Sequence, residues 1–372
     1  MHRLIAAAFA LPVLVFAATP VGAQQAPDAG AWKLEGDHTT LIPAKIALPT
    51  RAGTLSLSRT GESSQNGKGV DDVAEYETED RQIFGTAFIF FASYADAALA
   101  TLGTDRAIRQ LYGPAVMVDR ENVTAVDGVA DAVIHRVYEK GEREPGKPLT
   151  SVAGYIRAGR WVMVLRVTGP AARRAEVEAS FDALLAGLHF NGKDKPLVAA
   201  LPKISAPCPA SDQRPARSMG KSKDSGANAL IASLMGGAVT PGDEKTGEAP
   251  PLAFPRNGAA ALCVRGSVKA GNQMFDLLQP ASPDDGTTLL VQLDDAGGVL
   301  TVEPLLLGGG YQVKHYGIGM VQVLGSFRTL PTAAQLSAIL DGSDRAGSAI
   351  QSTTIFKPDG NSNIQIDMKA LK

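Results

Sequence analysis

The sequence lacks an excess of charge of either sign. Its 36 Lys and Arg residues nearly balance its 38 Asp and Glu residues, and the formal net charge is −2 at pH 7. A nucleic-acid-binding protein needs a basic surface that displaces counterions from the phosphates. A weakly acidic chain is also not drawn to a membrane surface by its charge. The composition therefore disfavours both nucleic acid and a membrane surface as partners.

Long hydrophobic runs are absent beyond the N-terminus. Residues 4–18 form an apolar run of about 15 residues, whereas a membrane-spanning helix needs roughly 20. Basic Arg3 precedes this run and the small residues Val21-Gly22-Ala23 follow it, an order typical of a secretory signal peptide over residues 1–23. An uncleaved anchor is the alternative. Gln24, and not a lipid-bearing Cys, stands directly after the cleavage site. The sequence therefore predicts export of an unanchored chain, with no membrane span after cleavage, to the bacterial periplasm or the extracellular space.

Cysteine is also scarce, with two residues, Cys208 and Cys263. Their separation excludes the C-x-x-C spacing of a typical redox pair. An exported chain folds in an oxidising compartment, where an even number of cysteines usually forms disulfides. In the chain-entropy description, closing this loop would stabilise the fold by about 4 kcal/mol. We therefore predict a structural Cys208–Cys263 bridge.

Complete motifs for cofactors and nucleophiles are absent too. Gly220-Lys221-Ser222 resembles the end of a phosphate loop, but Pro215 stands where that loop begins with Gly. Gly308-Gly309-Gly310 lacks the further glycine of a dinucleotide loop, because Val313 stands there, and it predicts a hairpin turn. No Gly-x-Ser-x-Gly elbow occurs. We therefore expect no cofactor.

Histidines are few and widely spread after the signal peptide, at positions His38, His135, His189 and His315. No two of them form a His-x-His or His-Glu-x-x-His pair, which favours structural roles over metal ligation. A catalytic triad assembled from distant residues is the alternative, since its members need not be close in sequence. His315, beside Tyr316 and near a Gly-rich turn, is the first position to examine for such a triad.

Six carboxylates gather within residues 71–80: Asp71, Asp72, Glu75, Glu77, Glu79 and Asp80. The ordered Asp, Asn and Gly pattern of a calcium loop is missing from this stretch. A solvated acidic face is therefore favoured over a calcium site. The sequence thus indicates no catalytic, cofactor-binding or metal-binding residue, and the disulfide is its one assigned site.

The mature chain of about 350 residues is long enough for two domains, each with its own core. Composition divides it into a flexible leader over 24–41, a first domain over 42–192, a linker over 193–207, and a β-rich α+β domain over 208–372 with a loop-rich insert at 211–257. One short helix is expected inside the insert, at 227–235. The expected fold class is α+β, with two domains that are each a largely antiparallel sheet with covering helices.

Helix signals in the first half are local. Ser93 is expected to cap a helix, with Asp96 in the capping-box position, and Gly113-Pro114 to end it. A second helix is expected after Pro170. Its apolar residues recur at helical spacing and should cover the sheet: Val177, Phe181, Leu184, Leu185 and Leu188.

Strand signals are equally local. Segments 151–157 and 160–168 predict a hairpin whose second arm is apolar on both faces and so lies inside a sheet. In the second half we expect strands at 260–268, 273–278, 287–293, 299–307 and 311–324, the last one bent near Gly317 and Gly319. Thr332 and Gln335 predict a capping box at the start of a helix. Segments 353–357 and 363–368 predict a last hairpin.

The order of elements in the first half carries a resemblance. The segment Gly154-Tyr-Ile-Arg-Ala-Gly-Arg-Trp-Val-Met-Val-Leu-Arg-Val-Thr-Gly-Pro, followed by a helix ending Phe181-Asp-Ala-Leu-Leu, resembles the end of a PsbP-like domain. The resemblance covers about residues 42–190, under half of the chain, and rests on plan and hydrophobic pattern. It implies an α/β/α sandwich around an antiparallel sheet. Such domains share no catalytic motif, so the resemblance implies a binding or assembly module.

Three functional hypotheses follow. The first is an exported, non-catalytic protein that binds an envelope protein or ligand. The second is a secreted hydrolase with a dispersed active site, which would gain from a His within hydrogen-bond reach of a Ser or carboxylate in a cleft. The third is an assembly scaffold whose 211–257 loop orders on binding.

Overall fold

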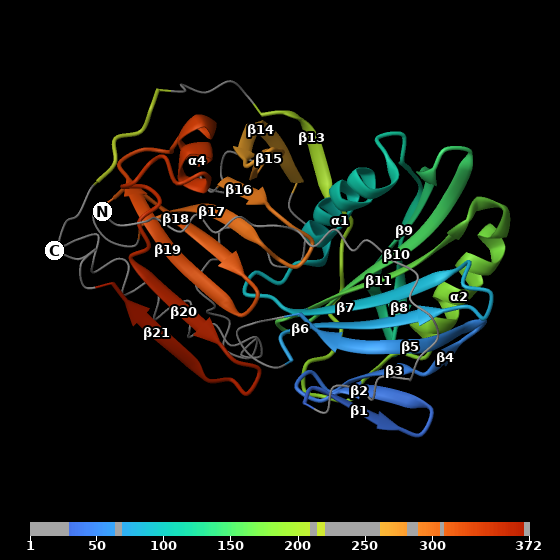
Figure 1. Ribbon diagram of the computed structural model, residues 1–372. Helices are drawn as coiled ribbons and strands as arrows, with labels where there is room; N and C mark the ends of the chain where they lie inside the picture. The colour runs from blue at the N-terminus through green and yellow to red at the C-terminus, as the bar shows by residue number, and fades with distance from the viewer. Residues whose placement is uncertain are drawn as a thin grey trace, which may run out of the picture.

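The computed structural model describes residues 30–63, 69–208, 214–219, 261–280, 289–305 and 309–367. The predicted signal peptide, the Gly220-Lys221-Ser222 fragment and the helix expected at 227–235 lie outside the described residues. Within them the chain is mostly β-strand, in three sheets with few helices (Figure 1), which agrees with an α+β or mostly-β class. No helix in this described part is long and apolar enough to cross a membrane.

An eight-stranded antiparallel sheet forms the centre of the N-terminal half. Its order is β4-β5-β6-β7-β11-β10-β9-β8. The strands are β4 (Arg51–Ala52), β5 (Leu55–Glu62), β6 (Asp71–Glu77), β7 (Phe84–Phe91), β8 (Met117–Val126), β9 (Val129–Glu144), β10 (Lys147–Ala158) and β11 (Trp161–Pro170). The predicted hairpin is confirmed as β10 and β11. Its doubly apolar arm, β11, lies inside the sheet between β7 and β10, as expected.

Helices cover both faces of this sheet. Helix α1 (Ala97–Tyr112) packs on one face, where Ala98 and Ile108 share a core with Val162 and Val164 of β11. Helix α2 (Arg174–Ala186), preceded by the short 3₁₀ helix η1 (Ala171–Arg173), packs on the other face. The predicted apolar stripe is confirmed, because all five of its residues are buried: Val177, Phe181, Leu184, Leu185 and Leu188.

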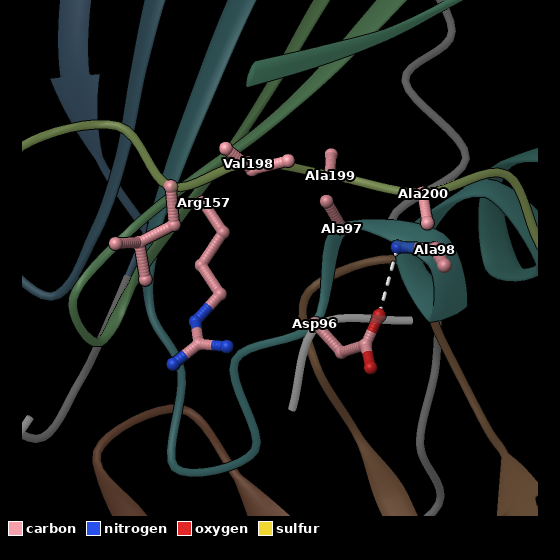
Figure 2. A pocket seen from close by; sticks show the side chains of 8 residues that line it. Asp96, Ala97, Ala98, Arg157, Val198, Ala199 and Ala200 are labelled. Carbon is pink, nitrogen blue, oxygen red and sulfur yellow. Dashed lines mark hydrogen bonds between the residues drawn. The ribbon is translucent and has the colours of Figure 1, made fainter. Parts of the chain in front are cut away.

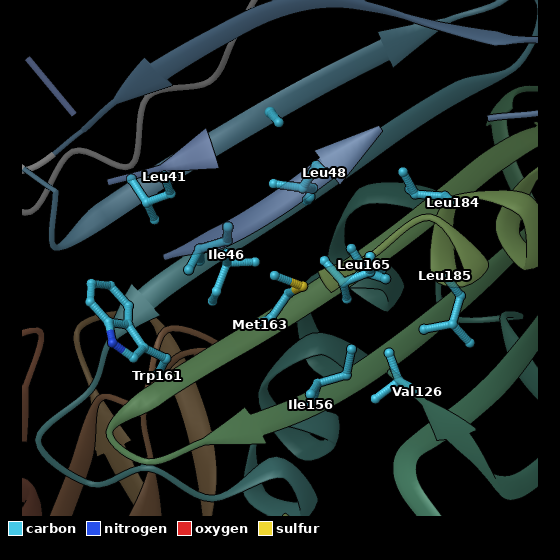
Figure 3. Close-up of a cluster of buried hydrophobic side chains, with 14 of the residues drawn as sticks. Leu41, Ile46, Leu48, Val126, Ile156, Trp161, Met163, Leu165, Leu184 and Leu185 are labelled. Carbon is cyan, nitrogen blue, oxygen red and sulfur yellow. The ribbon is translucent and has the colours of Figure 1, made fainter. Parts of the chain in front are cut away.

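A small four-stranded antiparallel sheet lies on the same face as α2. Its strands are β1 (Trp32–Glu35), β2 (His38–Leu41), β3 (Ile46–Pro49) and β12 (His189–Phe190), in the order β1-β2-β3-β12. Figure 3 shows Leu41, Ile46 and Leu48 of this sheet together with Met163 and Leu165 of β11, in the largest core cluster. The small sheet and α2 therefore form one layer over the eight-stranded sheet.

The prediction of a flexible leader over 24–41 is wrong for its described C-terminal part. Trp32 is only 3% exposed, and Leu41 is fully buried. Strands β1 and β2 pair along four positions, from Trp32 opposite Leu41 to Glu35 opposite His38. The polar composition of this stretch reflects mainly its outward-facing residues, whereas the buried side chains of Trp32, Thr39 and Leu41 tie it to the core.

The start of α1 also differs from the prediction. Asp96, and not Ser93, is the N-cap, since its Oδ1 accepts hydrogen bonds from the backbone N of Ala98 at 2.8 Å and of Leu99 at 3.1 Å. Ser93 instead donates its backbone N–H to the carbonyl of Gly317 at 3.1 Å. Asp and Ser are comparable caps, so the tertiary contact of Ser93 decides between them. The helix ends at Gly113, as expected.

A nine-stranded sheet forms the C-terminal half, in sequence order from β13 to β21. The strands are β13 (Lys203–Pro207), β14 (Ala261–Ala270), β15 (Gln273–Pro280), β16 (Leu289–Gln292), β17 (Val299–Pro304), β18 (Tyr311–Gly317), β19 (Met320–Phe327), β20 (Ser352–Phe356) and β21 (Ser362–Ile366). Helix α4 (Ala333–Leu340) packs against β14, and the predicted Thr332–Gln335 capping box is confirmed. The single bent strand expected over 311–324 is two strands, because Gly319, with φ of 58°, reverses the chain between β18 and β19.

The end of the expected linker over 193–207 is also a strand. Strand β13 pairs in parallel with β14, and the backbone N of Cys208 donates to the carbonyl of Val264 at 2.9 Å. The sulfur atoms of Cys208 and Cys263 lie 2.00 Å apart, with the Cα atoms 5.0 Å apart, as the predicted pairing requires. The bridge therefore joins β14 to the residue that follows β13, at one edge of the nine-stranded sheet.

The two halves pack against each other over an apolar surface. Ala92 and Ile318 form an isolated antiparallel bridge, and the backbone N of Gly319 donates to the carbonyl of Phe91 at 2.7 Å. Tyr94 and Tyr316 meet edge to face at 5.2 Å. The largest core cluster also includes residues of the C-terminal half. The cores of the two halves are thus continuous.

Helix α1 makes the second part of this contact and lies between the two larger sheets (Figure 1). Arg106 donates from Nη1 to the carbonyl of Gln292 at 3.0 Å, and its guanidinium stacks over Phe275 at 4.2 Å. Gly103 approaches so closely that a Cβ atom there would lie 2.4 Å from the carbonyl oxygen of Asp294. Only glycine fits this position without a shift of backbone.

Candidate functional site

The fold brings two distant histidines together on the small sheet. The ring centroids of His38 and His189 lie 5.5 Å apart, with the ring planes tilted by 46°. His38 belongs to β2 and His189 to β12, and both strands pair with β3, opposite Pro49 and Ala47 respectively. These two β3 residues are two positions apart and so project to the same face. The pairing register therefore explains why the rings meet.

Each ring is held by a carboxylate. Nδ1 of His38 lies 2.7 Å from Oδ1 of Asp37, and Nδ1 of His189 lies 3.2 Å from Oδ1 of Asp127. An ionised carboxylate only accepts hydrogen bonds, so each Nδ1 is the donor to its carboxylate and each Nε2 is the ring nitrogen without a carboxylate partner. Within the described residues, no hydrogen bond reaches either Nε2 and none joins these rings to a Ser or Cys side chain.

The position of Asp127 follows from the chain around it. Strands β8 and β9 are joined by Asp127-Gly128, with φ of 48° and 78°, the left-handed pair that an Asp-Gly hairpin turn adopts. The other oxygen of Asp127, Oδ2, accepts from the backbone N of Phe190 at 3.0 Å. The turn therefore holds β12 in place and presents a carboxylate to His189 at the same time.

Both carboxylates are stabilised as anions. The hydrogen bond from His38 is the main cause that lowers the pKa of Asp37. Burial works to raise the pKa of Asp127, but the bonds from Phe190 and His189 outweigh it, and the net shift is downward. Two anionic carboxylates thus orient the two imidazole rings, an arrangement able to bind a cation.

The other two histidines have separate, structural surroundings. His135 lies against Phe181 of α2 at 5.1 Å between ring centroids, and its Nδ1 lies 2.9 Å from Oδ1 of Asn122. His315 of β18 reaches Gln322 at 3.4 Å, while Tyr316 donates its hydroxyl to Glu303 at 2.9 Å. His315 and Tyr316 thus bond to different side chains, and within the described residues no hydrogen bond joins His315 to a Ser or a carboxylate.

The acidic stretch 71–80 does not converge on one point. Asp71 and Asp72 are neighbours on β6 and so project to opposite faces of the sheet. Glu75 pairs with Arg59 at 2.5 Å, and Asp80 pairs with Arg173 at 2.5 Å. Among the residues that the structure describes, no group of three or more His, Cys, Asp and Glu side chains is placed to hold a metal ion.

One pocket lies at the start of α1 (Figure 2). It is lined by Asp96, Arg157 and the apolar segment 197–200, and its volume is about 10 Å³. Burial raises the pKa of Asp96 to about 6, although the N–H groups of the first helical turn counteract the effect. A volume of about 10–15 Å³ holds one water molecule, and ligand pockets measure about 300–1,000 Å³. The perturbed Asp96 is thus a helix cap beside a water-sized hollow.

A buried polar network attaches α1 to the sheet. Arg136 of β9 pairs with Asp105 of α1 at 2.7 Å and with Glu121 of β8. Tyr138 donates to Asp105, and its hydroxyl lies 2.8 Å from that of Tyr155. Burial is the main cause that raises the pKa of both tyrosines. Every polar side chain of this network has a partner within it, which indicates a structural role.

Comparison with protein-family models and with curated proteins finds no match to this chain. The PsbP-like resemblance and the functional hypotheses therefore stay predictions. The sequence offered one partial signal for the histidine site, the adjacent pair Asp37-His38. The approach of His189 depends on strand pairing over 151 positions of the chain, which no local pattern shows.

Proposed function

We propose that this chain is an exported, non-catalytic protein that binds a partner in the bacterial envelope. The partner adds a strand along the outer edge of β21, which is the last strand of its sheet among the described residues. The observation that carries the proposal is the unprotected character of this edge. Strand addition of this kind gains its affinity from main-chain hydrogen bonds and its specificity from side-chain pockets. Export of the chain and its division into two domains are parts of the same proposal.

Other strand edges carry features that hinder such pairing. Strand β8 presents Asp119, Arg120 and Glu121, and its pairing with β9 has two register shifts. Strand β13 contains Lys203 and Pro207. Charges, prolines and bulges are the devices that keep natural sheet edges from pairing with other chains.

Strand β21 has none of these devices. Its residues Ser362, Asn363, Ile364, Gln365 and Ile366 are uncharged, and they pair with β20 without a register shift. Among the described residues it is the last strand of the sheet. Its outer edge therefore offers a regular row of backbone donors and acceptors.

The backbone register identifies which groups face outward. Asp367 donates to the carbonyl of Gln351 at 3.0 Å, and Asn361 accepts from Lys357 at 2.9 Å. In an antiparallel ladder the bonding direction alternates along the strand. Odd-numbered residues of β21 thus bond inward to β20, and Ser362, Ile364 and Ile366 direct their backbone groups outward.

A pair of substitutions at one position tests the proposal. Ile364→Pro removes an outward N–H while leaving the inner ladder, whereas Ile364→Ala shortens the same side chain and keeps the N–H. Tagged mature protein is incubated with an envelope extract and cross-linked. We expect the wild type and Ile364→Ala to capture a common partner. The amount captured by Ile364→Pro should fall at least about tenfold, because one or more main-chain hydrogen bonds are lost.

Capture that is unchanged in Ile364→Pro contradicts strand addition at β21, and no partner in any sample contradicts the binding role. The secreted hydrolase is the second candidate, because His189 lies within hydrogen-bond reach of Asp127. This second candidate predicts that the mature protein hydrolyses an ester or peptide substrate, and that His189→Ala abolishes the activity.

A further inference from the structure

We propose that His38 and His189 bind one divalent transition-metal ion through their Nε2 atoms, with Asp37 and Asp127 as hydrogen-bonding supports. The site lies on the small sheet, far along the chain from β21, and its evidence is independent of the proposed binding role. It joins strands from the two ends of the N-terminal half, β2 and β12.

The spacing of the rings fits a shared ion. Metal–nitrogen bonds to histidine are about 2.0–2.1 Å, so two rings bound to one tetrahedral ion have centroids about 5–6 Å apart. The observed separation is 5.5 Å. The rings are therefore already spaced for a common ligand, without a rearrangement of strands.

The hydrogen bonds at Nδ1 supply the second part of the pattern. A metal-binding His usually donates its other ring N–H to a carboxylate, which fixes the tautomer and makes the ligand more basic. Here both rings have this support, from Asp37 at 2.7 Å and from Asp127 at 3.2 Å. Two neighbouring rings, each supported by a carboxylate at Nδ1, thus match the hydrogen-bonding pattern of histidine metal ligands.

Exposure allows an ion to enter. The His38 side chain is 27% exposed and that of His189 is 47% exposed. Two protein ligands leave open positions on the ion, which water or a group of a partner molecule fills. Imidazole ligands favour Cu²⁺, Ni²⁺ and Zn²⁺ over the oxygen-preferring Mg²⁺ and Ca²⁺.

The test is calorimetric titration of the mature protein, purified without a histidine tag, with Cu²⁺, Ni²⁺, Zn²⁺ and Mg²⁺ in turn. We expect one ion of Cu²⁺, Ni²⁺ or Zn²⁺ per chain and no saturable binding of Mg²⁺. His38→Ala and His189→Ala each weaken binding more than tenfold, and Asp127→Asn weakens it by about 10–100-fold, the usual effect of losing such a support. His315→Ala, in the other half of the chain, is the matched control and leaves the affinity unchanged.

Thermal unfolding gives a second readout that also checks folding. An ion that binds only the folded chain raises Tm, so Ni²⁺ should raise the Tm of the wild type and of His315→Ala but not that of His189→Ala. With EDTA present, all three are expected to unfold within a few degrees of one another, because His189 is half exposed. Absence of saturable binding, or equal affinity in the variant that lacks both His38 and His189, overturns the proposal.

Discussion

Trp32 donates its indole N–H to Oδ1 of Asp72 at 3.1 Å, across 40 positions of the chain. This bond ties β1 of the small sheet to β6 of the eight-stranded sheet. Asp72 is fully buried, and its Oδ2 has no hydrogen-bond partner among the described residues. Burial, with the nearby charge of Glu62, raises the pKa of Asp72 to about 7.

The first prediction is that Asp72→Asn removes part of the pH dependence of stability. The pKa of an unfolded Asp is about 3.9, so between about pH 4 and pH 7 the folded chain holds more protons than the unfolded chain. The free energy of unfolding therefore falls as pH rises through this window. Asn is neutral, and its Oδ1 still accepts from Trp32. Urea unfolding should show a variant that matches the wild type near pH 4 and is more stable than it at pH 8.

Asp71 contributes in the same direction, because burial and three nearby carboxylates raise its pKa to about 6. In Asp72→Asn the free energy of unfolding therefore still falls with rising pH, but with a shallower slope than in the wild type. Asp182→Asn, at an exposed position of α2, is the control and should follow the wild-type profile. An Asp72→Asn slope equal to that of the wild type would show that Asp72 ionises normally in the fold.

The second prediction concerns Gly103, where helix propensity and packing have opposite signs. Propensity alone favours Ala over Gly in a helix interior by about 1 kcal/mol. A Cβ at this position would meet backbone atoms of Asp294 and Asp295 at 2.4–2.8 Å. We therefore expect Gly103→Ala to lower the free energy of unfolding, measured by urea titration. Gln110→Ala, on the exposed end of the same helix, is the control with little effect. A stabilised Gly103→Ala would mean that α1 does not dock so tightly against this loop.

The third prediction separates a buried ion pair from an exposed one. The Arg136 side chain is 6% exposed and serves both Asp105 and Glu121, whereas Arg120 is 48% exposed and pairs with Glu178. Arg136→Ala leaves two partly buried carboxylates without their cation and should cost about 3–5 kcal/mol. Arg120→Ala should cost about 0–1 kcal/mol, the usual value of a surface pair. Chemical unfolding measures both, and equal costs would contradict the structural role of the network.

The fourth prediction concerns the bridge between Cys208 and Cys263. In the chain-entropy description, replacing both residues by Ser should destabilise the fold by about 4 kcal/mol. The wild type treated with a reductant should lose a similar amount, and the Ser variant should not respond to the reductant. Non-reduced peptide mapping should recover both cysteines in one linked peptide, and two free thiols in the native protein would contradict the bridge.

Sequence patterns located those elements whose signals are local. The hairpin over β10 and β11, the α2 stripe around Phe181, and the Thr332–Gln335 capping box each depend on neighbours within one or two turns of chain. The sequence indicated Ser93 as the cap of α1, whereas Asp96 caps it and Ser93 bonds to Gly317 of the other half. Local signals therefore identified elements better than they identified their ends.

Long-range pairing accounts for what the sequence did not reveal. Residues 32–41 are polar enough to suggest a leader. Their two strands are explained only by contacts distant in sequence, the hydrogen bond from Trp32 to Asp72 and the packing of Leu41 in the core. The pairing of His38 and His189 was the hardest feature to predict, since no local sequence motif marks either histidine as part of a site. Their meeting is a property of β3, which pairs with both of their strands.

The bridge at the edge of the nine-stranded sheet has a topological consequence. The sulfur link joins positions 55 apart in the sequence, the first directly after β13 and the second inside β14. A single peptide-bond scission between Cys208 and Ala261 would leave both fragments covalently joined, and each would keep its own strand of that parallel pair. Such a nicked molecule would migrate as one species until a thiol was added, so the intact backbone of this protein must be judged on a reducing gel.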